Sequence, residues 1–167
     1  AAALSWIVME WIIKGKPTTL GIASGAVAGL VAITPAAGFV GPVSSVIIGL
    51  VAGAICYFAV LAKHSLKYDD ALDVVGVHCV GGIWGAIATG LFASKAINSA
   101  GSDGLFFGNP GQLWTQIIAV LVTMVYSFVV TLVILYIIKA VVGLRVTEED
   151  EFVGCDTSEH GENAYNI

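Results

Sequence analysis

The chain has 167 residues, of which 57% are hydrophobic and 11% are charged, and its mean hydropathy is +0.92. Soluble domains carry about 25% charged residues, so this composition excludes an ordinary soluble domain and predicts a polytopic membrane protein. The formal net charge is −5, and most of the excess acid lies in the C-terminal tail. Because the chain has no basic patch, we expect no nucleic-acid partner.

The first apolar run, residues 2–13, is too short to cross a hydrocarbon core of about 30 Å at about 1.5 Å per residue. No initiator Met and no basic segment precede it. We interpret residues 1–13 as the end of a truncated transmembrane helix. A signal peptide is the alternative. Against it, Glu10 interrupts the apolar run with Trp6 and Trp11 on either side of it, and no small-residue cleavage site follows.

Four further apolar runs are long enough to span a bilayer and predict an all-α transmembrane region within residues 18–144. They cover residues 20–39, 43–62, 71–93 and 113–143. The last run is longer than a bilayer requires, so we expect this helix to tilt or to extend beyond the membrane.

The basic residues fall almost entirely on one side of the predicted membrane. If the first segment runs inward, only Lys95 lies outside, and the cytoplasmic side then carries Lys14, Lys16, Lys63, Lys67, Lys139 and Arg145. This asymmetry follows the positive-inside rule, which counts Lys and Arg and gives Asp and Glu little weight. The tail, residues 145–167, is therefore predicted to be cytoplasmic although it is acidic.

Glycines recur every four residues in the second and third apolar runs. Gly21, Gly25 and Gly29 form one series, and Gly49 and Gly53 form the other. Small residues at this spacing let helix backbones approach closely inside a membrane. We therefore assign both series to helix packing rather than to chemistry.

Apart from the Cys79 thiol, His78 is the one ionisable side chain in residues 74–93. An ionisable group inside a membrane span is costly and indicates function by default. At helical spacing His78 shares a stripe with Gly82, Gly85 and Thr89, so the imidazole projects from a face of small or weakly polar residues. We expect it to line a pore and to contact the substrate or its proton; the alternative is a packing histidine bonded to a neighbouring carbonyl.

Three carboxylates, Asp69, Asp70 and Asp73, precede this span. Acidic residues suit a helix N-terminus because they accept its free N–H groups and complement its dipole, so we place the helix start near Asp70. For Asp70 and Asp73 we favour a structural capping role. A role in attracting cations at the inner mouth of a pore is the alternative.

Cysteine usage gives no sign of a disulfide framework or a metal site. Cys56 and Cys79 lie inside apolar spans and Cys155 lies in the tail, so we expect three free thiols. Cys155 and His160 are five residues apart but lack the further ligands that a structural zinc site requires. The spans also lack a second histidine, which argues against an intramembrane metalloenzyme, and we expect no metal, no cofactor and no catalytic residues.

Several long blocks give the chain a family resemblance. They read GKPTTLGIASGAVAGLVAITPAAGFVGP, DDALDVVGVHCVGGIWGAIATGLFA, GNPGQL and GLRVTEEDEFVGCDTSEHGENAY, in this order. The chain resembles the Amt/Mep/Rh ammonium transporters, and most closely their Amt branch, over essentially its whole length. The resemblance places it in the C-terminal portion of an eleven-helix protein, from the end of the seventh helix through the eleventh helix to the cytoplasmic tail.

The resemblance implies a homotrimer in the cell membrane whose subunits each have a narrow apolar pore between two inverted five-helix repeats. It makes His78 the second member of a pair of pore histidines, and it implies ammonium or methylammonium as the substrate. Ammonium would shed its proton and cross as a neutral molecule. An ammonium sensor that signals through the tail is the alternative function.

The tail carries a separate set of expectations. Its polar, acidic composition alone favours disorder, whereas the resemblance implies a tail that folds beneath the pore, touches the neighbouring subunit and responds to PII-type signal proteins. Thr157 and Ser158 are candidate phosphorylation sites, since added charge can order or melt such a segment. The candidate regulatory residues are Arg145, Gly154, Asp156, Thr157, Ser158, His160, Gly161 and Tyr165.

Overall fold

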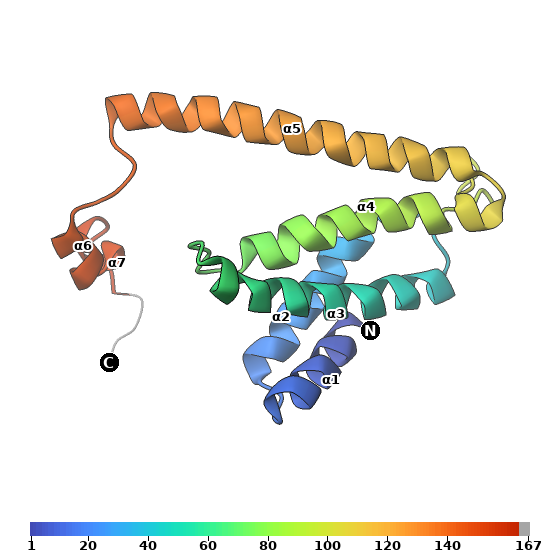
Figure 1. The fold of residues 1–167 in the computed structure, drawn as a ribbon, viewed down its shortest axis with the longest axis horizontal. Helices are drawn as coiled ribbons and strands as arrows, with labels where there is room; N and C mark the ends of the chain where they lie inside the picture. Colours follow the sequence, from blue (N-terminus) through green and yellow to red (C-terminus); the bar gives the residue numbers. More distant parts are fainter. Residues whose placement is uncertain (164–167) are drawn as a thin grey trace. The chain divides into compact units, whose positions relative to one another are not determined.

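The computed structural model describes residues 1–163, and the regular secondary structure in this part is entirely helical (Figure 1). The α-helices are α1 (Ala2–Lys14), α2 (Thr19–Ile33), α3 (Pro42–Leu66), α4 (Val80–Phe92), α5 (Pro110–Val141), α6 (Glu148–Val153) and α7 (Cys155–Ser158). Three short helical turns accompany them: η1 (Thr34–Ala36), the π-turn η2 (Val75–Cys79) and η3 (Leu105–Phe107).

Four segments of the described chain are long and apolar enough to cross a membrane. They are Thr19–Ala36, Pro42–Leu66, Val75–Phe92 and Pro110–Val141. These segments correspond to the four predicted spans and confirm the all-α, multi-pass class. The first helix, α1, has 13 residues and is shorter than a span.

The chain divides into two compact units, Ala1–Val122 and Thr123–Ile167, and each is described by itself. The long helix α5 passes from the first into the second. It has 32 residues, none of them buried, and is about 48 Å long at about 1.5 Å per residue. It begins at Pro110 rather than near Leu113, since proline fits the first position of a helix.

Both glycine series pack against the same helix, α1. A Cβ atom placed on Gly25 of α2 would lie 2.6 Å from Trp6 Cβ, and one on Gly53 of α3 would lie 2.9 Å from Ser5 Cβ. Gly29 is equally close to Ala2. The helix α1 therefore contacts α2 and α3 along their glycine faces, which confirms the predicted packing role (Figure 1).

The core of the first unit joins these helices to α4. Trp6 of α1 and Tyr57 of α3 meet edge to face, with ring centroids 5.5 Å apart. On α4, Gly85 lies against the backbone of Ala32, and the Trp84 indole donates a hydrogen bond of 3.0 Å to the Ile48 carbonyl. These contacts hold α4 against α2 and α3 and thereby position the segment that carries His78.

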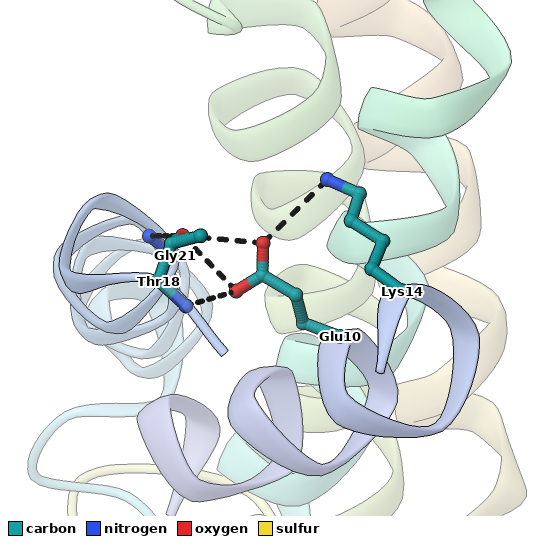
Figure 2. Close-up of polar contacts among 4 residues, drawn as sticks. All are labelled: Glu10, Lys14, Thr18 and Gly21. Carbon is teal, nitrogen blue, oxygen red and sulfur yellow. Dashed lines mark hydrogen bonds and ion pairs between the residues drawn. The ribbon is translucent and has the colours of Figure 1, made fainter. Parts of the chain in front are cut away.

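A buried carboxylate joins α1 to the start of α2 (Figure 2). Glu10 is 3% exposed and accepts hydrogen bonds from the Thr18 backbone N–H, at 3.0 Å, and from the Thr18 hydroxyl. The same hydroxyl oxygen accepts a hydrogen bond of 2.9 Å from the Gly21 N–H and so caps α2. Lys14 lies 3.5 Å from Glu10. In the sequence Glu10 only interrupts an apolar run, but in the fold it fixes the α1–α2 connection.

Candidate functional site

The helix that carries His78 is preceded by an irregular linker, Tyr68 to Asp73, and its first helical residue is Val74. The start is therefore four residues later than the predicted position near Asp70. The Asp70 carboxylate still reaches forward and accepts hydrogen bonds of 2.8 Å from the backbone N–H groups of Val74 and Val75. In this way it satisfies two N–H groups that the helix itself leaves free.

The Asp73 side chain makes a different contact. Its carboxylate pairs with the ammonium group of Lys63, which also donates a hydrogen bond of 2.8 Å to the Asp70 carbonyl. Asp73 has a φ of 56°, in the left-handed region that Asp tolerates better than most residues. Its own carbonyl accepts a hydrogen bond of 2.9 Å from the Val77 N–H. In the sequence Lys63 contributes only to the positive-inside asymmetry, and nothing in its spacing from Asp73 indicates this ion pair.

His78 lies in the π-turn η2, which packs against α3. A Cβ atom on Gly76 would lie 2.7 Å from the Val60 side chain, and the Cys56 thiol is 3.8 Å from the Val77 carbonyl. Single π-turns inside helices are uncommon and occur frequently at functional sites. In this π-turn Gly76 and Val77 are buried, whereas His78 is exposed.

The predicted stripe along this segment divides into an open and a packed half. His78 is exposed, and a Cβ atom on Gly82 would meet nothing within 4 Å. Gly85 packs on α2, and the buried Thr89 hydroxyl donates a hydrogen bond of 2.9 Å to the Gly85 carbonyl. Among residues 1–163 the His78 imidazole has no hydrogen-bond partner, and both its pore-lining role and the packing alternative stay predictions.

The described part of the tail forms a small local structure where composition alone favours disorder. Arg145 binds Glu151 through two hydrogen bonds of 2.5 and 2.7 Å, and the Thr147 hydroxyl accepts a hydrogen bond from the Asp150 N–H at the start of α6. Gly154, with a φ of 102°, separates α6 from α7.

The other tail candidates lie on or just after α7. Asp156, Thr157 and Ser158 belong to the helix, and the Asp156 carbonyl accepts a hydrogen bond of 2.8 Å from the Glu162 N–H. Thr157 and Ser158 are exposed. His160 and Gly161 follow the helix, while Tyr165 lies outside the described residues.

The ion pair in the tail predicts a pH dependence. The Arg145 hydrogen bonds hold the pKa of Glu151 below its ordinary value of 4.5. A lowered folded-state pKa stabilises the fold fully above 4.5, and that contribution is lost as the pH falls below 4.5 through the lowered value. We expect α6 amide protons to exchange faster below this range, after correction for intrinsic exchange. Glu151→Gln should abolish the pH dependence; Glu149→Gln, an exposed neighbour, should leave it intact.

No group of three or more His, Cys, Asp or Glu side chains within residues 1–163 is arranged to hold a metal ion. The first unit, residues 1–122, is an apolar helical assembly in which the imidazole of His78, near the start of one span, is exposed. The chain is thus a multi-pass, all-helical membrane protein whose distinctive polar group lies on a transmembrane segment.

Comparison with known proteins identifies the family. The profile described as "Ammonium Transporter Family" matches residues 1–165, so the chain belongs to this family. An ammonium transporter of Bacillus subtilis is 55% identical over 99% of this chain, which covers 41% of that relative. The Archaeoglobus fulgidus transporter Amt1 is 50% identical over 98% of this chain and is covered to 41%. The chain therefore spans about two fifths of the curated relatives it matches.

Solved structures agree with this assignment. Saccharomyces cerevisiae Mep2 matches with a TM-score of 0.83 and 36% identity, over 89% of this chain and 35% of that chain. A protein described as "Sensor Amt Protein" matches with a TM-score of 0.81 and 31% identity, over 95% of this chain and 38% of that chain. Both matches show that this chain has the fold of a C-terminal portion of proteins in this family.

Proposed function

We propose that the complete protein, of which this chain forms a C-terminal portion, transports ammonium across the cell membrane through an apolar pore lined in part by His78. The observation that carries the proposal is the family match over residues 1–165, with relatives named as ammonium transporters. The exposed imidazole on an otherwise apolar span is consistent with it.

The physical basis of selectivity is desolvation. Ammonium and potassium are both small monovalent cations, and entering an apolar pore without water is very costly for either. Ammonium alone can leave its proton behind and cross as a neutral molecule. An imidazole can take up and return a proton near physiological pH, which makes His78 a suitable relay together with a second pore histidine from the preceding part of the protein.

The remaining site residues have supporting roles in this proposal. Asp70 caps the helix that carries His78, and Asp73 holds the inner linker through Lys63. We further propose that residues 1–13 end one transmembrane helix, that residues 18–144 hold four spans, and that residues 145–167 form a cytoplasmic regulatory tail. The asymmetric placement of Lys and Arg supports this orientation.

Uptake into liposomes that contain the complete transporter tests this proposal. We expect labelled methylammonium to accumulate with saturable kinetics, to be displaced by ammonium and to be unaffected by the same concentration of potassium. Equal inhibition by both ions would show that no deprotonation step selects the substrate. Uptake no faster than into empty liposomes would overturn the transport assignment.

An ammonium sensor is the second candidate function. The structural likeness to the protein described as "Sensor Amt Protein" supports this candidate. In both readings the tail acts as a regulatory segment, reached by a PII-type protein and by the neighbouring subunit of a homotrimer. Deleting residues 145–167 distinguishes the two. A transporter with a regulatory tail keeps ammonium-selective uptake but changes its rate, whereas a sensor binds ammonium without transport in either form.

A further inference from the structure

We infer that Lys63 is a positioning residue for His78, and this inference rests on the proposed transport function. Lys63 lies near the end of α3, 15 positions before His78 in the sequence. It acts through the linker that leads into the π-turn, by holding Asp70 and Asp73 in place.

The first step is the attachment of the linker, residues 68–73, to α3 through Lys63. The Lys63 ammonium group pairs with the Asp73 carboxylate and donates a hydrogen bond to the Asp70 carbonyl. The Lys63 side chain is 17% exposed and the Asp73 side chain 30% exposed, so solvent screens this pair less than it screens a surface pair. One cation thus fixes two points of an irregular segment to the end of α3.

The second step leads from the linker to the helix start. The two residues that Lys63 holds are also the residues that bind the first N–H groups of the following helix. Asp70 accepts hydrogen bonds from Val74 and Val75 through its carboxylate, and Asp73 accepts one from Val77 through its carbonyl. Asp73 does so from a left-handed conformation, which is unfavourable unless the surroundings maintain it.

The third step is the direction of the imidazole. The π-turn Val75–Cys79 follows this start at once and contains His78. Each residue of an α-helix turns by about 100°, so loss of the π-turn would shift the direction of His78 relative to α4 by about this angle. The close contact of Gly76 with Val60 supports the turn from α3, the helix that also provides Lys63. The linker and α3 therefore fix the orientation of His78 together.

The test compares Lys63→Met with Lys67→Met in the complete transporter, reconstituted at equal density and assayed by ammonium-evoked current. Lys67 is an exposed lysine one turn further on; its backbone N–H caps α3 by donating to the Lys63 carbonyl, but its side chain makes no hydrogen bond or ion pair among the described residues. We expect Lys63→Met to lower the maximal current by about tenfold or more, because small misplacements of reacting groups reduce rates steeply. The half-saturating ammonium concentration should change little. Lys63→Arg, which keeps the charge, should retain most of the current.

Three results would overturn the inference. One is an equal current for Lys63→Met and Lys67→Met, and another is a loss in Lys63→Met that Lys63→Arg does not recover. If Lys63→Met does not assemble, Asp73→Asn removes the same ion pair while keeping a side chain that tolerates the left-handed conformation; an unchanged maximal current in Asp73→Asn is the third. Failure of the proposed function looks different, since wild-type protein would then carry no ammonium current and uptake would be absent.

Discussion

Gly25→Val is expected to prevent stable folding of the helical assembly or to lower its free energy of unfolding by about 3 kcal/mol or more. A Cβ atom on Gly25 would lie 2.6 Å from Trp6 Cβ and 3.0 Å from Ala3 Cα. These neighbours belong to a helix backbone or are bonded directly to it, so they cannot rotate aside. The valine would therefore have to push α1 away from α2, and the loss of packing would extend to Gly29 and Gly53.

Thermal unfolding of the purified protein in detergent checks this expectation. Ala23→Val on the exposed side of α2 serves as the matched control, because it adds a valine to the same helix without entering the interface with α1. Gly25→Ala should have an intermediate effect. A melting temperature for Gly25→Val equal to that of Ala23→Val would show that the glycine face is not a close contact.

Glu10→Leu is the second substitution with a large expected effect. It removes the acceptor of the Thr18 N–H and hydroxyl in a place where Glu10 is 3% exposed. Leaving a buried donor without a partner costs about 1–3 kcal/mol, and hydrogen bonds to a charged group lie at the upper end. We expect a destabilisation of about 3 kcal/mol, although leucine is more apolar and would suit a membrane protein by composition alone.

The matched control for Glu10→Leu is Lys14→Met. Lys14 belongs to the same network, but its side chain is 52% exposed, so its ion pair with Glu10 should contribute about 0–1 kcal/mol. Glu10→Gln keeps one oxygen for Thr18 and should fall between the two. If unfolding temperatures of Glu10→Leu and Lys14→Met agreed, Glu10 would have no structural role beyond a surface ion pair.

The sequence was sufficient for the features that depend on hydrophobic length and spacing. Four apolar runs became four membrane-length segments, because few other structures satisfy backbone hydrogen bonds in lipid. The spacing of Gly21, Gly25 and Gly29 showed that a close helix contact would form. It did not show which helix would pack there, since the spacing describes only the surface of the helix that carries the glycines. The structure shows that α1 contacts both glycine series.

The features that sequence reasoning missed depend on contacts between distant residues. Glu10 interrupts an apolar run, and only the folded connection shows that Thr18 meets it. The π-turn at His78 departs from the helical period of 3.6 on which the predicted stripe rested. Asp70 and Asp73 are both acidic residues just before the helix, yet the Asp70 carboxylate caps the helix and the Asp73 carboxylate pairs with Lys63. Asp73 alone adopts a left-handed conformation, which the sequence does not show.

The role of His78 is tested most directly by the current that ammonium evokes in liposomes containing the complete transporter, with wild type and His78→Ala at matched incorporation and potassium as the control ion. A side chain that transfers protons in a rate-limiting step contributes about 10²-fold or more, so we expect the ammonium current of His78→Ala to fall by about this factor or to lose its selectivity over potassium. An unchanged current with unchanged selectivity would contradict the placement of His78 in the conduction path.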